Sequence, residues 1–299
     1  MKLTVAVQEF LTAQEADGSS GQTVAWYRSL LKKFVGFTGD VEIETISTSQ
    51  IRQYIIEVRR QYAPDTAHGH VRSQHKFWRW CSIEYDLKNP MRNIKYPAQP
   101  KQKEPKAAAV NDLVAMFRAI DTSTHIGRRD RAILAFLVDT GSRSAGVYTL
   151  KVANLDLVNR RAVVTEKGNK SRQVMFTEVT AACLASWMEI RSPVEHVFYS
   201  MTKIKPLTRS GVYQIMKRLK KNAGVLGRAN PHALRHAFSL EYLKAGGDLA
   251  TLSRLLGHSD IATTAAYYAV FAQNELAELH DQFSQAHFLE DVDKGELGV

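Results

Sequence analysis

Cysteine and long apolar runs are both scarce in this sequence. Cys81 and Cys183 are the two cysteines among 299 residues, and one distant pair offers neither a disulfide framework nor the paired spacing of a structural zinc site. We expect both thiols to be buried, reduced and inert. No window approaches the roughly 18 uninterrupted apolar residues of a membrane span, and the N-terminal segment lacks the apolar core of a signal peptide. These absences exclude a membrane protein and a disulfide-rich secreted protein, and we expect a cytoplasmic chain.

The sequence also lacks the motifs of nucleotide and metal chemistry. It contains no Walker-type GxxxxGK[ST] loop, no clustered metal ligands and no internal repeat. We therefore expect no cofactor. The hydrophobic share of 44% and the charged share of 23% are typical of a folded chain rather than a disordered one. At this length the chain can form two compact domains, each with its own core.

Acidic residues are scarce in the middle of the chain. Residues 105–270 hold 24 basic and 12 acidic side chains, whereas residues 1–104 hold 15 and 11, and residues 271–299 hold 1 and 7. A strongly cationic domain attracts a polyanion, and nucleic acid is the commonest one in the cytosol. A solvated surface that happens to be basic is the alternative interpretation of the same charge.

The first hundred residues show apolar residues at helical spacing and no strand pattern. Ser47 and Gln50 have the form of a capping box at the start of one of these helices. The aromatic cluster Phe77, Trp78 and Trp80 could stack on nucleic acid, but on an amphipathic helix it is more often core. This pattern predicts a helical N-terminal domain over residues 1–94.

A connector and a second, mixed domain follow. Residues 95–110 combine Pro, Lys, Gln and Ala without hydrophobic periodicity, so they predict an extended linker. Residues 111–289 predict a mainly helical domain with a small antiparallel β-sheet, and residues 290–299 form an acidic tail. The expected elements are a helix from about residue 111, an apolar helix around residues 133–137, a hairpin of strands 161–165 and 172–176, and helices at 208–221, 232–246, 248–256 and about 261–285.

Four short motifs stand in order within the second domain. They are TGSR, EKGNKSR, HALR and LLGH, and a tyrosine follows nine positions after the last histidine. This order resembles the signature of the tyrosine recombinases, also called phage-type integrases, and the helical N-terminal domain is similar to their core-binding domain. The resemblance implies six catalytic residues, which are Arg143, Lys167, His232, Arg235, His258 and Tyr267.

The residue types also suit the cleavage of a phosphodiester without a metal ion. Such a reaction needs a nucleophile, cations on the non-bridging oxygens and an acid for the leaving oxygen. Arg143 and Arg235 are assigned as a phosphate clamp, because a guanidinium stays charged and can donate two parallel hydrogen bonds to a phosphate. His232 stands three positions before Arg235, so both point from one face of a helix. In isolation, such a His–Arg pair is more often an exposed surface feature without a catalytic role, and the same holds for a histidine at a helix end, such as His258. The order of all the motifs together favours a catalytic role.

The resemblance gives the remaining residues their roles. It makes Lys167 the general acid for the departing 5′ oxygen, although Lys170 leaves the choice between the two lysines open. Tyr267 would attack phosphorus and form a 3′-phosphotyrosyl link. Tyr268 is the rival nucleophile; neighbours on a helix point about 100° apart, so one of them faces the clamp, and the spacing favours Tyr267. The basic runs 128–131 and 217–221 could line phosphate or form solvated helix faces.

Some positions depart from the family pattern. Ser142 stands where leucine is commoner, Gly146 where an acidic residue is commoner, and residues 268–270 differ from the frequent Thr-His-Val. These departures bear on the subfamily, and they favour an element integrase slightly over a chromosome-dimer resolvase. The two-domain layout resembles the short, Xer-like recombinases.

The resemblance further implies partners and a mechanism. It predicts a site-specific recombinase that binds double-stranded DNA as a homo-tetramer on paired sites, with room for accessory proteins, no membrane association, and a nucleoid location when bound to DNA. The acidic, amphipathic residues 271–289 suit docking on a neighbouring protomer or packing within the same chain. Two alternatives from other classes are a type IB topoisomerase-like relaxing enzyme and a non-catalytic DNA-binding protein.

Overall fold

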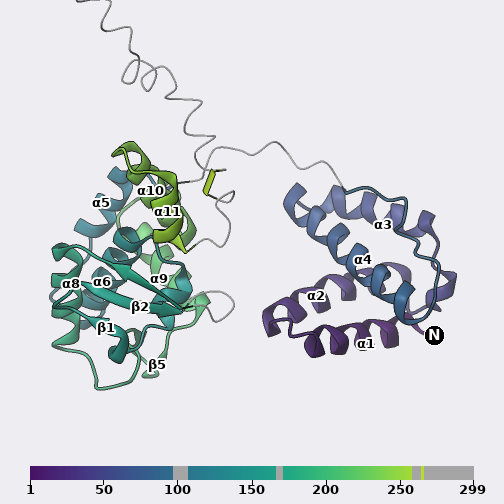
Figure 1. Cartoon of the computed structure of the whole chain (residues 1–299), viewed down its shortest axis with the longest axis horizontal. Coiled ribbons are helices and arrows are strands. Elements are labelled where there is room, and N and C mark those ends of the chain that lie inside the picture. The colour runs from purple at the N-terminus through teal and green to yellow at the C-terminus, as the bar shows by residue number, and fades with distance from the viewer. Residues whose placement is uncertain (97–106, 166–170, 258–263, 266–299) are drawn as a thin grey trace, which may run out of the picture. The chain divides into compact units, whose positions relative to one another are not determined.

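The computed structural model describes residues 1–96, 107–165, 171–257 and 264–265. The chain divides into two compact units, Met1–Lys103 and Glu104–Val299, each with its own hydrophobic core. The two units are coloured along the chain in Figure 1. Most of the expected connector at residues 95–110, as well as the tail at 290–299, lies outside the described residues. The domain limits given above therefore stay predictions.

The N-terminal unit consists of helices, as its apolar spacing predicts. Phe77 and Trp78 are completely buried in its core, where Phe77 meets Phe10 edge to face at 5.5 Å between ring centroids. Their interpretation as core residues is thereby confirmed. The capping box is also present, because the Ser47 and Gln50 side chains each pair with the other residue's backbone N–H. The helices are α1 (Leu3–Ala16), α2 (Gly21–Thr38), α3 (Thr48–Gln61) and α4 (Pro64–Glu84), with a short 3-10 turn at Ile43–Thr45.

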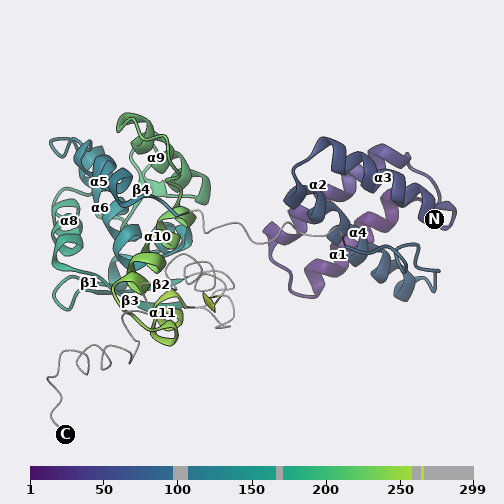
Figure 2. The same ribbon diagram turned by 90° about the horizontal axis from the view of Figure 1, so that it is seen from above.

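The second unit combines helices with two small antiparallel sheets, which confirms the predicted fold class. Figure 2 shows it turned by 90° from Figure 1. Its strands are β1 (Leu155–Asp156), β2 (Arg161–Thr165) and β3 (Ser171–Met175) in one sheet, and β4 (Tyr199–Ser200) and β5 (Lys205–Pro206) in the other. Its helices are α5 (Val110–Arg118), α6 (His125–Thr140), α7 (Ser144–Tyr148), α8 (Glu178–Met188), α9 (Arg209–Asn222), α10 (Pro231–Lys244) and α11 (Leu249–Leu256).

The expected hairpin is present as β2 and β3, with β3 beginning one residue earlier than predicted. Ala162 pairs with Val174, and Val164 pairs with Arg172. Ala162, Val164 and Val174 are buried, while the residues between them along the strands are exposed. This alternation places one face of the hairpin on the core. The last expected helix, at about residues 261–285, falls mostly outside the described residues.

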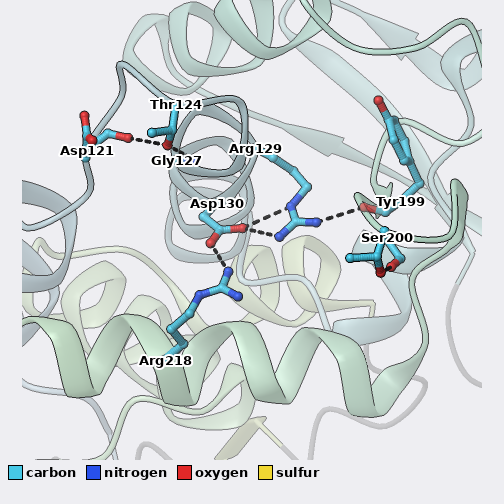
Figure 3. Close-up of polar contacts among 9 residues, drawn as sticks. Asp121, Thr124, Gly127, Arg129, Asp130, Tyr199, Ser200 and Arg218 are labelled. Atoms are coloured by element: carbon cyan, nitrogen blue, oxygen red, sulfur yellow. Dashed lines mark hydrogen bonds and ion pairs between the residues drawn. The ribbon is translucent and has the colours of Figure 1, made fainter.

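A buried ionic network connects α6, α9 and the β4–β5 hairpin (Figure 3). The Arg129 guanidinium donates to Asp130 Oδ1 at 3.0 and 2.8 Å and to the Tyr199 carbonyl oxygen at 3.0 Å. Arg218 on α9 pairs with the other oxygen of Asp130. Side-chain exposure is 6% for Arg129 and 2% for Asp130. The suggestion that the whole basic run 128–131 lines phosphate is therefore wrong for Arg129, which is needed inside to pair the buried Asp130.

The two cysteines differ in their surroundings. Cys81 is fully buried, and burial raises the pKa of its thiol to about 12. Cys183 lies on α8 beside the buried row of Thr180, Leu184 and Trp187, and is half-buried. The expectation of two buried thiols is thus wrong for Cys183, because it stands at the edge of the helix face that meets the core. In the described part of the chain, no helix is long and apolar enough to span a membrane.

Candidate active site

The junction between α6 and α7 positions Arg143. α6 ends at Thr140, and its C-cap Gly141 has a left-handed φ of +58°. A Cβ at Gly141 would lie 2.7 Å from the Phe238 ring and 3.1 Å from a Leu256 methyl. Glycine is therefore required both by the turn and by the close approach of α10 and α11. Arg143 follows at the N-cap of α7 and is half-buried.

Hydroxyl groups hold this junction. The Thr140 hydroxyl lies 2.8 Å from Ser142 Oγ, and the Ser142 backbone N–H donates to Thr140 Oγ1 at 3.2 Å. Ser142 is fully buried, so its hydroxyl gains partners that the commoner leucine would lack. Gly146 is explained by packing, because a Cβ there would lie 3.1 Å from Ser142 Cβ and 3.4 Å from Val164 Cβ. The small residue lets α7 pack closely on β2.

The start of α10 places His232 and Arg235 one helical turn apart. Asn230 caps this helix by accepting from the backbone N–H groups of His232 and Ala233, both at 3.0 Å, and Pro231 occupies the first turn. Both residues suit a helix start, since the asparagine oxygen satisfies exposed N–H groups and the proline ring presets the backbone. The predicted i, i+3 geometry of His232 and Arg235 is present.

Arg235 joins three of the motifs. Its side chain is buried, with a residue exposure of 4%. Nη1 donates to the Gly141 carbonyl oxygen at 2.8 Å, and Nη2 donates to the Leu256 carbonyl oxygen at 2.6 Å. TGSR, HALR and LLGH, which are far apart in the sequence, are thus brought together around one guanidinium.

His232 lies in a positive environment. Burial by surrounding atoms lowers its pKa below the ordinary value of 6.5, and the positive charges of Arg209, Arg235 and Arg143 lower it further. His236, one turn later, is more deeply enclosed, and burial lowers its pKa to about 4. Both imidazoles are therefore neutral near pH 7. A neutral His232 can donate through one ring nitrogen and accept through the other.

The structure brings Arg143, His232 and Arg235 into one neighbourhood. Lys167, His258 and Tyr267, as well as the rivals Lys170 and Tyr268, lie outside the described residues, so their roles remain predictions. Arg172, the last residue of the EKGNKSR motif, lies in this region, and the motif assigned it no role. It lies on β3 and donates to the Leu255 carbonyl oxygen at 2.5 Å. Its position opposite Val164, on the core side of the hairpin, was the signal in the sequence that could have marked it.

Comparison with known proteins identifies the family. Residues 108–274, more than half of the chain, match the model of the phage integrase family. The chain belongs to the phage integrase family. This confirms the predicted class, a tyrosine recombinase, which is an enzyme of site-specific DNA recombination.

Among similar tyrosine recombinases is the XerD recombinase of Staphylococcus epidermidis, which is 28% identical over 298 residues that cover 94% of this chain and 99% of the relative. A lambda integrase tetramer bound to a Holliday junction has the same fold, with a TM-score of 0.75 and 17% identity over 89% of this chain and 77% of that one. XerH bound to its difH substrate after cleavage also shares it, with a TM-score of 0.71 and 18% identity over 92% of this chain and 82% of that one.

Proposed function

We propose that this recombinase cleaves and rejoins DNA through a covalent link to Tyr267. The Tyr267 hydroxyl gives its proton to solvent as its oxygen attacks the phosphorus, the bond from phosphorus to the 5′ oxygen breaks, and the DNA 3′ end becomes joined to the enzyme as a phosphotyrosyl ester. Lys167 protonates the departing 5′ oxygen. A free 5′ hydroxyl then attacks the ester to rejoin the strand. The ester conserves the energy of the broken bond, so this scheme requires no cofactor.

The observation that carries this proposal is the meeting of three motifs around Arg235. The bonds from Arg235 to Gly141 and Leu256 fix the plane of its guanidinium, and Arg143 follows two residues after Gly141. The Arg235 guanidinium held in this way, together with the charge of Arg143 close by, can stabilise the negative charge that develops on the phosphate oxygens. Preorganised cations of this kind replace the metal ion that many phosphoryl-transfer enzymes use.

His232 supports the clamp as a neutral group. Its imidazole stays uncharged near pH 7, as argued from its lowered pKa, and can donate a hydrogen bond to a phosphate oxygen without adding further charge to the cluster. We assign His258 a similar hydrogen-bonding role, on the basis of its place in the LLGH motif. The six proposed catalytic residues thereby share the work of attack, charge stabilisation and proton transfer.

The assembly is proposed by analogy. The lambda integrase tetramer is bound to a Holliday junction, and XerH is bound to its palindromic difH substrate. We assign double-stranded DNA and a homo-tetramer on paired sites to this chain, with residues 1–94 as the core-binding domain, 95–110 as the linker and 111–289 as the catalytic domain. The protein would act in the cytoplasm, on DNA of the nucleoid.

Covalent capture tests the proposal. The protein is expressed in cells beside Tyr267→Phe and Tyr268→Phe variants, the cells are denatured rapidly, and protein-bound DNA is recovered and sequenced. We expect adducts at a discrete site for the wild type and for Tyr268→Phe, and none for Tyr267→Phe. Adducts lost in Tyr268→Phe instead would move the nucleophile by one residue.

A plasmid relaxation and recombination assay, added to the capture experiment, separates the alternative functions. A type IB topoisomerase-like enzyme would relax supercoiled plasmid without giving recombinant product. A wild type that folds and binds DNA but forms no adduct in a host that carries the site would indicate a non-catalytic DNA-binding protein.

A further inference from the structure

Arg172 on β3 lies on the face of the hairpin whose other residues pack against the core. Ala162, Val164 and Val174 on this side are buried, and Arg172 stands opposite Val164 in the same row. Arginine at such a position is unfavourable unless its N–H groups are hydrogen-bonded, because removing a charge from water is costly. The presence of an arginine at position 172 therefore requires a structural or functional explanation.

The contacts of Arg172 supply that reason. Nη1 donates to the Leu255 carbonyl oxygen at 2.5 Å, and Nη2 lies 3.5 Å from Ser142 Oγ. Leu255 belongs to the last turn of α11, and Ser142 directly precedes Arg143. Figure 2 shows α11 beside β3, as the first of these bonds requires. One side chain thus connects the hairpin to two motif segments that lie 83 and 30 positions away.

The end of α11 is shaped to receive this side chain. α11 ends at Leu256, and its C-cap Gly257 has a φ of +65°. A Cβ at Gly257 would lie 2.5 Å from Arg172 Cδ and 3.0 Å from Arg172 Nε. The aliphatic stem of Arg172 therefore packs directly against the Gly257 backbone. The glycine of the LLGH motif satisfies both the left-handed turn and the space that Arg172 occupies.

Arg172 and Arg235 form two neighbouring ties between the same segments. Arg235 bonds to the carbonyl groups of Gly141 and Leu256. Arg172 bonds to Ser142, which follows Gly141, and to the carbonyl group of Leu255, which precedes Leu256. Two adjacent ties restrain rotation of the segments as well as their separation. The segment that leads into Arg143 is thereby held at a fixed position relative to Arg235.

We propose that Arg172 is a positioning residue for strand cleavage, one that acts through Arg143 and Arg235 without touching DNA. In the sequence, Lys167 stands between β2 and β3. The bonds of Arg172 therefore connect β3, the strand that follows the proposed acid, to the proposed phosphate clamp. This inference rests on the proposed function of the clamp. A misplacement of about 1 Å in such a site can reduce the rate about 100-fold.

Two substitutions and a matched control test this role. Arg172→Met keeps an apolar stem and removes the donors, Arg172→Lys keeps the cation with a shorter reach, and Arg161→Met removes an exposed arginine of the same hairpin that pairs with Asp156. The probe is a duplex oligonucleotide carrying the site recovered from wild-type adducts. Its dissociation constant is measured by gel shift, and the rate of adduct formation is measured in single turnovers at saturating DNA.

We expect Arg172→Met to slow adduct formation about 100-fold at saturating DNA, with the dissociation constant within about twofold of wild type, and Arg172→Lys to recover part of the rate. Arg161→Met should match the wild type. Wild-type rates for both Arg172 variants would overturn the proposal. Equal losses in binding and rate would also overturn it, because they would make Arg172 a DNA-binding residue.

Amide hydrogen exchange without DNA distinguishes this inference from the proposed function. Loss of the tie in Arg172→Met should speed exchange in residues 254–257 while α6 stays protected. Unchanged exchange in residues 254–257 would refute the tie itself. If Arg172→Met does not fold, the comparison of Arg172→Lys with the wild type decides both measurements. A wild type that forms no adduct would instead refute the proposed function, and the catalytic role with it, even where the exchange result confirms the tie.

Discussion

At the scale of single residues, His232 illustrates how surroundings determine a protonation state. His232 is exposed, yet neighbouring protein atoms and three arginines, Arg209, Arg235 and Arg143, all disfavour its charged form. Because the pKa in the folded protein lies below the ordinary 6.5, the imidazole is neutral throughout the range near pH 7. The cluster of cations that is proposed to bind a phosphate thus keeps its histidine uncharged.

This protonation state predicts the pH dependence of cleavage. The rate of adduct formation at DNA concentrations well below saturation, which reports the ionisation of the free protein, should be level from pH 8 to 6.5 and fall at lower pH as His232 becomes charged. His232→Gln keeps a neutral hydrogen-bonding group that does not titrate, so we expect a lower rate without this acid limb. Single-turnover rates between pH 5 and 8 provide the measurement. A limb with its midpoint above 6.5, or one that persists in His232→Gln, would contradict the assignment.

At the scale of elements, the buried network of Figure 3 fixes α6 against α9 and the β4–β5 hairpin. Asp130 is the shared partner of Arg129 and Arg218, and its own exposure is 2%. Removing one partner of a buried pair leaves an uncompensated charge inside the protein. The network therefore stabilises the packing on which the end of α6, and with it Arg143, depends.

Asp130→Asn should consequently destabilise the second unit strongly. We expect its free energy of unfolding to fall by about 3 to 5 kcal/mol, since Arg129 loses its anion in a buried place. Asp156→Asn is the matched control, because Asp156 pairs with Arg161 at the surface and such pairs contribute about 1 kcal/mol or less. Urea denaturation of the full chain, followed by amide exchange in α6, provides the measurement. Similar losses in the two variants would show that the network contributes no more than a surface pair.

The same elements show which features the sequence alone could predict. The capping box at Ser47 and the β2–β3 hairpin depend on residues a few positions apart, so local patterns located them. The burial of Arg129 and Asp130 depends on Tyr199, 70 positions from Arg129, and on Arg218, 88 positions from Asp130, and no local pattern indicates it. The site divides in the same way. Motifs gave roles to Arg143, His232 and Arg235, whereas Arg172, although it ends the EKGNKSR motif, acquires its role from a bond to Leu255, 83 positions away.

At the scale of the whole molecule, the charge distribution determines how DNA binding depends on salt. Residues 105–270 carry twice as many basic as acidic side chains, 24 against 12. Binding of such a region to duplex DNA releases counterions, so affinity falls as salt rises. The exposed lysines of α9, Lys217 and Lys221, have two interpretations: they contact phosphate, or they form a merely solvated face.

Salt titration decides between these two interpretations. If Lys217 and Lys221 each contact a phosphate, changing both to Gln should weaken binding to a nonspecific duplex and reduce the slope of log K against log salt by about 2. Lys151→Gln is the control, because Lys151 is already paired with Glu195 at 2.8 Å and should leave the slope nearly unchanged. The measurement is fluorescence anisotropy at several salt concentrations. An unchanged slope in the double variant would make this face of α9 a solvated surface, and the attraction for DNA would then have to arise from other cations of the second unit.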